Sequence, residues 1–298
     1  MKRSFFQFVT FFLLGLNSLI WAENIPIKIH SKAAILMELD SKNIIFQKNA
    51  YQSYSPASIT KLPSALYIIK KGKLAMDSVI TADQDTIGSI TKKYSLENNY
   101  KYPPHWLVLG GTHMRIHKGE QVRVKDLLHG MLLISANDAS NVLAKHSSGS
   151  IQVFMKELNK YLKDLGCKNT HFKNPHGLHF PKHTTTAFDM ALVACEAMKE
   201  PSLCKILKTK RYKINATNKK TEHDIHNENK LLNKKSAYYY PYAIGGKQGF
   251  HNTAKHTMIA AAKKGDKILV VVLLQCPSRH QKYEDAIKLF EHGFKNIK

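Results

Sequence analysis

The chain has 298 residues, 43% of them hydrophobic, which excludes a disordered polypeptide and allows one large domain or two small ones with a sizeable core. Its formal net charge is +23, from 45 Lys and Arg residues against 22 Asp and Glu residues. We attribute most of this charge to a lysine-rich composition that keeps the surface solvated.

The first 22 residues have the layout of a secretory signal peptide. Lys2 and Arg3 form a positive start, residues 5–20 form an apolar segment, and Ala22 ends it. An uncleaved membrane anchor is the alternative, because the apolar run approaches the length that spans a bilayer. Export predicts a periplasmic or cell-envelope location, where a basic chain meets anionic wall or membrane surfaces and no nucleic acid. We expect weak association with such surfaces, and a monomer.

Four cysteines follow the signal segment, and none of them forms a C-x-x-C pair: Cys167, Cys195, Cys204 and Cys276. Buried free thiols are the simpler interpretation, and a single disulfide stays open in an oxidising compartment.

The predicted elements alternate in type along the chain. Residues 33–50 predict a β-hairpin, residues 62–72 a buried helix and residues 83–111 a long polar loop. Helices are predicted at 124–149 (two, broken around 135–138), 151–166 and 184–200. Residues 205–217 have strand character, 255–275 form two strands and 283–294 form a closing helix.

This order predicts an α/β (α+β) fold in which both ends of the chain build one antiparallel sheet flanked by helices. An all-helical subdomain, at about 84–200, is inserted into a single domain that spans 23–298.

The tetrapeptide SITK occurs twice and offers two candidate nucleophiles, Ser58 with Lys61 and Ser89 with Lys92. Ser58 opens an apolar helix, where residues i and i+3 share a face, so Lys61 lies beside its hydroxyl. A lysine partly removed from water has a lowered pKa and can take the serine proton. Polar sequence follows Ser89, with no apolar face to bury Lys92. The spacing therefore favours Ser58.

Two further segments complete the pattern of serine–lysine acyl-transfer enzymes. Residues Ser135–Asn137 (SAN) lie in the break between two helices, and residues Lys247–Gly249 (KQG) precede the strand pair. A Ser/Asn turn and a basic turn explain each segment singly. Their order and spacing together argue against chance.

With these motifs the chain resembles the D-alanyl-D-alanine carboxypeptidases of the low-molecular-mass penicillin-binding proteins, the S11 serine peptidases. The segments that carry the resemblance are SPASITKL, KGEQVRVKDLLHGMLLISANDASNVLA, NTHFKNPHGLH, HTTTAFDMAL and SRHQKYEDAIKLFEHGF. The resemblance implies the penicillin-binding-protein/serine β-lactamase-like transpeptidase fold and no cofactor or metal. It also implies removal of the terminal D-alanine from peptidoglycan stem peptides, with β-lactams as inhibitors.

The resemblance further implies the roles of the site residues. Ser58 is the acylated nucleophile and Lys61 its base, while Ser135 and Asn137 relay protons and hold the substrate amide. Backbone N–H groups of Ser58 and Phe250 form an oxyanion hole. The substrate-binding residues are Lys247, Gln248, Gly249, Phe250 and Lys282.

Two residues depart from the family pattern. Gln248 stands where the family has threonine or serine, and Lys282 stands where it has an arginine that helps to hold the substrate carboxylate. Because a point charge replaces a bidentate fork at 282, we expect weaker carboxylate binding and slow acylation. We also expect no β-rich second domain or terminal amphipathic helix beyond the catalytic domain.

Three other functions stay open. A serine β-lactamase shares the motifs, but a class A enzyme needs a Glu-x-x-Leu-Asn segment, and here Glu157 directly precedes Leu158 and Asn159. A zinc peptidase is suggested only by scattered histidines without H-E-x-x-H, namely His176, His179, His183, His223 and His226. A catalytically weak peptidoglycan-binding relic is the non-enzyme alternative.

Overall fold

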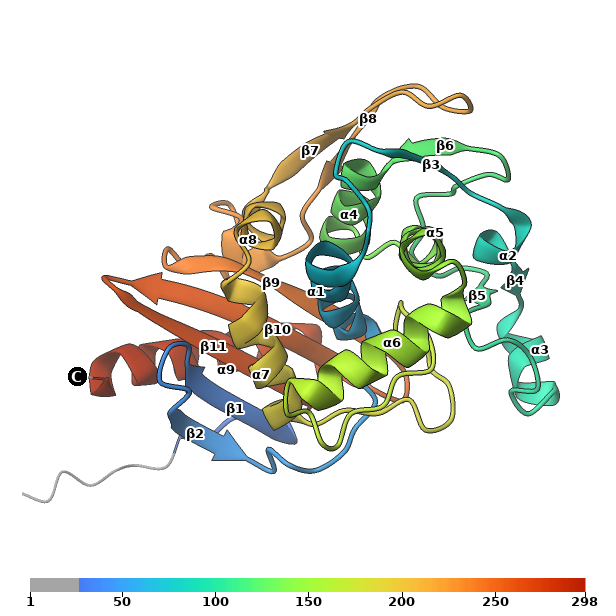
Figure 1. Cartoon of the computed structure of the whole chain (residues 1–298). Coiled ribbons are helices and arrows are strands. Elements are labelled where there is room, and N and C mark those ends of the chain that lie inside the picture. Colours follow the sequence, from blue (N-terminus) through green and yellow to red (C-terminus); the bar gives the residue numbers. More distant parts are fainter. Residues whose placement is uncertain (1–26, 298) are drawn as a thin grey trace, which may run out of the picture.

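A five-stranded antiparallel sheet forms the centre of the protein, for which a computed structural model describes residues 27–297. The predicted signal segment lies outside the described residues. The strand order is β2-β1-β11-β10-β9, with bounds β1 (Ala33–Glu38), β2 (Ile44–Lys48), β9 (Ala243–His251), β10 (Lys255–Lys264) and β11 (Lys267–Cys276). Both ends of the chain therefore supply strands to one sheet, as predicted, and β9 lies at an edge (Figure 1).

The central strands are buried on both faces. Val270, Val272 and Leu274 of β11 belong to one apolar cluster, while Leu269 and Leu273 belong to the cluster on the opposite face. Two-sided burial explains why this strand reads as a continuous apolar run instead of an alternating one. Helix α9 (Arg279–Asn296) covers one face, and the remaining long helices gather on the other (Figure 1).

The predicted helices of the middle region are confirmed. They are α1 (Lys61–Lys71), α4 (Val124–Leu133), α5 (Asn137–Ser148), α6 (Ile151–Asp164) and α7 (Ala187–Met198). The short helix η1 (Ala57–Thr60) directly precedes α1, and α8 (Pro201–Lys208) was not predicted. Helix α1 contacts α4, α5, α6, α7 and α8, so its N-terminal end is held firmly against the sheet.

Several short elements were not predicted. The segment expected to be a loop contains α2 (Gln84–Ile87), β4 (Ser89–Ile90), α3 (Lys92–Glu97) and β5 (Leu107–Val108). Short strands β3 (Val79–Thr81) and β6 (Gln121–Arg123) pair, so the inserted region also holds a strand. Strand β7 (Arg211–Ile214) lies in the segment predicted to have strand character and pairs with β8 (His223–His226), which was not predicted. Such elements are too short for periodicity, and side-chain caps define them instead: Asp83 caps α2 and Thr91 caps α3.

Two boundaries differ from the prediction in ways that matter for the site. The Lys247–Gly249 motif precedes the predicted strand pair, as expected, but it lies inside a further strand, β9, which was not predicted, and it does not form the basic turn of the alternative explanation. Helix α9 begins at Arg279 instead of residue 283, because Ser278 caps it by accepting a hydrogen bond from the N–H of Gln281. Residues 205–208, predicted to have strand character, complete α8.

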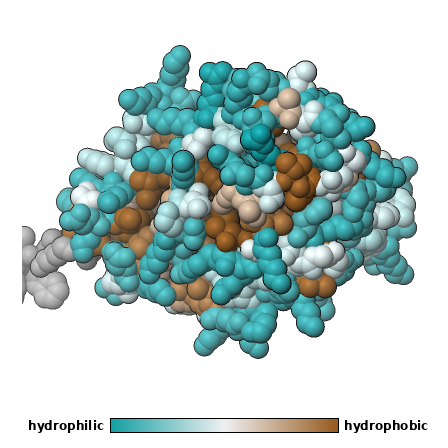
Figure 2. Space-filling view, turned by 45° about the horizontal axis from the view of Figure 1, so that its top comes forward, coloured by the Kyte–Doolittle hydropathy of each residue, from teal (hydrophilic) through white to brown (hydrophobic). Residues whose placement is uncertain are grey.

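The surface is mostly hydrophilic on the face shown in Figure 2, where hydrophobic groups lie between raised hydrophilic side chains. Within residues 27–297, no helix combines the length and the apolarity required to cross a membrane. All four cysteines are free thiols, and Cys204 alone is only half-buried, so the simpler interpretation of the cysteines is confirmed.

Candidate active site

Ser58 lies in the short helix η1, directly before α1, and its hydroxyl is 3.0 Å from Nζ of Lys61. The preceding residue, Ala57, has a φ of 52°, a conformation that costs free energy for a residue with a Cβ. Thr60 holds this bend by donating a hydrogen bond from Oγ1 to the Ala57 carbonyl (2.8 Å). The strained turn thus presents Ser58 at the sheet edge.

Lys61 is fully buried and has three polar neighbours. Its Nζ lies 2.7 Å from Oδ1 of Asn137 and 2.6 Å from the carbonyl oxygen of His176, besides the contact with Ser58. Burial, followed by the charge of Lys247, holds the pKa of Lys61 well below its ordinary value. A neutral amine has two N–H bonds and one lone pair, so the two carbonyl-type oxygens take the N–H bonds and the lone pair faces the Ser58 hydroxyl.

The second motif lies between α4 and α5. Ser135 has a φ of 65°, and its carbonyl accepts a hydrogen bond from Oγ1 of Thr112 (2.8 Å). Asn137 begins α5 and donates its backbone N–H to the Thr112 carbonyl (2.9 Å). Thr112 therefore fixes both ends of the loop, which explains how Asn137 reaches Lys61.

The third motif lies on β9, whose outer edge faces η1. A Cβ added to Gly249 would lie 2.6 Å from the backbone nitrogen of Ser58. Only glycine therefore lets the strand approach the nucleophile this closely. Lys247 is buried, donates from Nζ to the Gln248 carbonyl (2.8 Å), and has its pKa lowered to about 8 by burial.

These elements surround one cavity of about 320 Å³. Of the predicted site residues, six line it: Ser58, Ser135, Gln248, Gly249, Phe250 and Lys282. The other three, Lys61, Asn137 and Lys247, are buried and do not line the cavity. The structure therefore brings the predicted residues together, with the nucleophile facing the cavity and its base enclosed by protein.

Four residues that the sequence did not indicate also line the cavity: Thr112, Glu228, His256 and Arg279. Arg279 is exposed and lies one helical turn before Lys282 on α9. Recognising Ser278 as the helix cap would have extended the predicted helix to Arg279 and placed both cations on one face.

The basic residues that line the cavity differ in whether they are protonated near neutral pH. Burial, with smaller contributions from Arg279 and Lys247, lowers the pKa of Lys282 to about 7. Burial, together with Lys282 and Arg279, lowers the pKa of His256 to about 4, so this ring is neutral near neutral pH. Arg279 is therefore the cation that stays charged at every relevant pH.

Gln248 is held by a residue of α9. Its Oε1 accepts a hydrogen bond of 2.5 Å from the hydroxyl of Tyr283, which itself accepts from the N–H of Lys230 (3.3 Å). With the amide oxygen engaged, the remaining hydrogen-bonding group of Gln248 is its NH₂. No local pattern in the sequence indicates this contact, because Gln248 and Tyr283 are 35 residues apart.

The residues of the alternative interpretations do not line this cavity. Ser89 and Lys92 are both exposed. His176 uses both ring nitrogens: Nδ1 accepts from the N–H of Leu178 (3.1 Å) and Nε2 contacts the His105 carbonyl (3.1 Å). In the described part of the chain, no three His, Cys, Asp or Glu side chains are grouped to hold a metal ion.

Glu157 lies within 2.5 Å of the hydroxyl of Ser148 and 3.1 Å of that of Tyr67. It is half-buried between helices.

Known proteins resemble the chain in sequence and in fold. Residues 21–278 match the peptidase S11 family, described as D-alanyl-D-alanine carboxypeptidase. The D-alanyl-D-alanine carboxypeptidase DacF of Bacillus subtilis is 32% identical over 268 residues, which cover 89% of this chain and 62% of DacF. DacD of Escherichia coli is 28% identical over 306 residues, 100% of this chain and 73% of DacD. The chain thus spans less than two thirds of the length of DacF.

Two solved structures superpose closely on the fold. A D-alanyl-D-alanine carboxypeptidase from Mycobacterium tuberculosis has a TM-score of 0.77 and 26% identity, covering 93% of this chain and 96% of that one. The Streptomyces K15 DD-transpeptidase has a TM-score of 0.77 and 26% identity, covering 90% of this chain and 98% of that one. The family match extends over most of the sequence, and the fold agrees with these two solved structures, so the chain belongs to the D-alanyl-D-alanine carboxypeptidase family, peptidase S11.

Proposed function

We propose that the protein is a serine-type D-Ala-D-Ala carboxypeptidase that removes the terminal D-alanine from peptidoglycan stem peptides through a Ser58 acyl-enzyme. The observation that carries the proposal is the contact between the Ser58 hydroxyl and the fully buried amine of Lys61. The family match and its carboxypeptidase relatives support the reaction type. β-Lactams would acylate the same serine, and the site of action would be the cell envelope.

In the acylation step, Nζ of Lys61 takes the proton of Ser58 as Oγ attacks the carbonyl carbon of the penultimate D-alanine. The negative charge that develops on the carbonyl oxygen is held by the backbone N–H groups of Ser58 and Phe250, each such donor being worth roughly 3 kcal/mol of barrier. The C–N bond then breaks, the leaving D-alanine receives the proton, and water hydrolyses the ester. Ser135 lines the same cavity and would relay the proton.

The cations of α9 would orient the substrate in the cavity. Arg279 and Lys282 line the same cavity as Ser58, so the terminal carboxylate of the substrate would lie against them. The NH₂ of Gln248, whose amide oxygen is engaged by Tyr283, supplies a further donor. Burial lowers the pKa of Lys282 to about 7, and Glu228, which lines the same cavity, offsets a small part of this lowering. Arg279 thus supplies the bidentate group that Lys282 lacks.

The paired SITK segments provide the test. Fluorescent penicillin should label the wild type and Ser89→Ala, and should not label Ser58→Ala, with mass spectrometry locating the adduct on the peptide that contains Ser58. Release of D-alanine from an acyl-D-Ala-D-Ala peptide should follow the same pattern.

Other results would assign a different function. Rapid hydrolysis of the penicillin without D-alanine release would indicate a β-lactamase. No labelling of a folded wild type would indicate a relic that only binds peptidoglycan. Loss of labelling in Ser89→Ala alone would refute the assignment of Ser58.

A further inference from the structure

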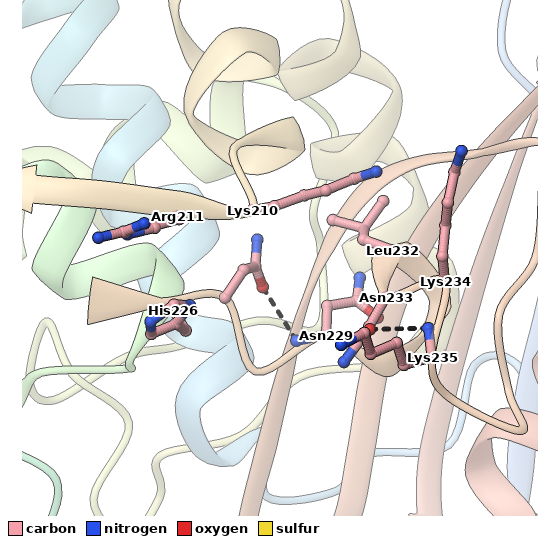
Figure 3. Close-up of a pocket in the computed structure, with 9 residues that line it drawn as sticks. Lys210, Arg211, His226, Asn229, Leu232, Asn233, Lys234 and Lys235 are labelled. Atoms are coloured by element: carbon pink, nitrogen blue, oxygen red, sulfur yellow. Dashed lines mark hydrogen bonds between the residues drawn. The ribbon is translucent and has the colours of Figure 1, made fainter. Parts of the chain in front are cut away.

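A second cavity, of about 360 Å³, lies beside the active site and shares none of its lining residues. Strands β7 and β8 supply one side of this cationic hollow, and the segment around η2 (Lys230–Leu232) supplies the other (Figure 3). Two consecutive residues line the two cavities: Glu228 lines the active-site cavity, and Asn229 lines the hollow.

The hollow is strongly positive. Lys210, Arg211, Lys234 and Lys235 line it, and none of its nine lining residues carries a carboxylate. Arg211 is paired with Asp224 at 2.5 Å. The three lysines have no ion-pair partner among residues 27–297. Three uncompensated ammonium groups around one hollow favour an anionic ligand.

The base of the hollow holds an unused hydrogen-bond donor. Asn229 is only 4% exposed, and its side-chain Nδ2 is buried without a partner in the described part of the chain. Its Oδ1 accepts from the N–H of Leu231 (3.1 Å), which fixes the side chain and leaves Nδ2 as the free end. A buried donor without a partner is unfavourable, so a ligand that reaches Nδ2 and accepts this bond is favoured.

The surrounding backbone is rigidly held. Nδ2 of Asn227 donates to the carbonyls of Leu207 (3.2 Å) and Thr209 (2.9 Å), next to Lys210. Oδ1 of Asn233 accepts from the N–H of Lys235 (3.0 Å), which fixes the turn that carries the other two lysines (Figure 3). The cationic side chains therefore project from fixed positions around Asn229.

We propose that the cationic hollow binds a phosphate or diphosphate group, with Lys210, Lys234 and Lys235 offsetting its charge and Nδ2 of Asn229 donating to one oxygen. Phosphate is favoured over carboxylate because lysines act as point charges, whereas the planar fork that suits a carboxylate belongs to Arg211 and is occupied by Asp224. The phosphate has two sources that present the same chemistry, a soluble phosphate ester and a lipid headgroup.

The test measures binding without a peptidase substrate, so its outcome is independent of the proposed activity. Inorganic diphosphate is titrated calorimetrically into the purified chain at about 0.15 M salt, where long-range attraction is screened. A second arm measures co-sedimentation with phosphatidylcholine vesicles that contain phosphatidic acid.

Two changes to the hollow are compared with two controls. Asn229→Asp keeps the oxygen that accepts from Leu231 and replaces the free donor with a negative charge, while K210Q/K234Q/K235Q removes the cations. The matched controls are Asn99→Asp and K156Q/K163Q/K168Q, which make the same charge changes at exposed positions elsewhere. Far-UV circular dichroism and a cooperative urea transition show that each variant is folded, without use of the peptidase activity.

We expect saturable diphosphate binding that both changes to the hollow weaken at least ~10-fold, while the controls change it less than about twofold. The same pattern on vesicles alone would also support the hollow and would assign a lipid headgroup as the source. Equal losses in hollow and control variants, or no binding in either arm, would overturn the proposal.

Discussion

Lys61 combines full burial with a contact to the nucleophile, and its protonation state decides whether Ser58 can react. Its pKa is lowered first by burial and then by Lys247. In the wild type, acylation should rise with pH as Lys61 loses its proton and should level off well below the ordinary lysine pKa of about 10.4.

We predict that Lys61→Met acylates at least ~100-fold more slowly, because general-base assistance is typically worth that much. The measurement is the second-order rate of labelling by fluorescent penicillin between about pH 5 and about pH 9. Lys92→Met, in the second SITK segment, should match the wild type. A Lys61→Met variant that keeps both the rate and the pH profile would show that another group is the base.

Arg279 and Lys282 should contribute differently to carboxylate binding as pH changes. The pKa of Lys282 is about 7, so its charge is present below pH 7 and is lost as pH rises through that value. Arg279 keeps its charge throughout. Arg279→Gln should therefore lower kcat/KM for an acyl-D-Ala-D-Ala free acid by about 10- to 100-fold, and the loss should be larger at pH 8 than at pH 6, within the roughly 1.5–3 kcal/mol expected for a charged hydrogen bond.

The C-terminal amide of the same peptide is the control, because it has no carboxylate to bind. Arg279→Gln should leave the rate on the amide nearly unchanged, and Lys282→Gln should reduce the rate on the free acid mainly below pH 7. Equal losses on acid and amide would mean that Arg279 acts through the structure of α9 instead of the carboxylate.

At the scale of elements, the site depends on the close approach of the edge strand β9 to η1. The sheet can place β9 there only because position 249 has no side chain, since a Cβ would lie 2.6 Å from Ser58 N, 2.7 Å from Thr257 Oγ1 and 2.9 Å from Ala57 Cβ. Two of these three neighbours belong to the strained turn that carries the nucleophile.

We predict that Gly249→Ala forces β9 and η1 apart, slows acylation at least ~10-fold and destabilises the fold by about 1–3 kcal/mol, the usual cost of overpacking. Gly88→Ala is the control, because its nearest neighbour would be the Trp106 ring at 3.4 Å. Urea unfolding and labelling by fluorescent penicillin check the two effects. Normal acylation by a destabilised Gly249→Ala would show that the spacing of the two elements does not limit the reaction.

At the scale of the whole molecule, the buried lysines serve the active site but lower the free energy of unfolding. Lys247 and Lys282 have folded pKa values of about 8 and about 7. The unfolded chain keeps the ordinary lysine pKa of about 10.4 and so binds more protons between pH 7 and pH 10. Stability therefore rises with pH across this window.

We predict that the wild type unfolds at a higher urea concentration at pH 9 than at pH 7, with Lys282 alone contributing on the order of 1–2 kcal/mol. Lys282→Met should be more stable than the wild type at pH 7 and should show a smaller increase toward pH 9. Parallel curves for the two proteins would mean that Lys282 keeps its proton in the folded state.

The sequence by itself determined the elements that local spacing defines. Apolar runs predicted the hairpin, the paired strands and the long helices, and the i, i+3 spacing placed Lys61 beside Ser58, because neighbouring turns of one helix fix such contacts. The order of the motifs indicated the family, because each motif is a short continuous segment that can be recognised in the sequence.

Tertiary structure alone decided the contacts between distant segments. The amine of Lys61 is oriented by Asn137, 76 residues away, and by the carbonyl of His176, 115 residues away. The bond between Tyr283 and Gln248 and the grouping of Lys210 with Lys234 and Lys235 likewise join separate elements. The apolar periodicity of the sequence does not predict such contacts, because they arise only when packing of the sheet and helices brings the segments together.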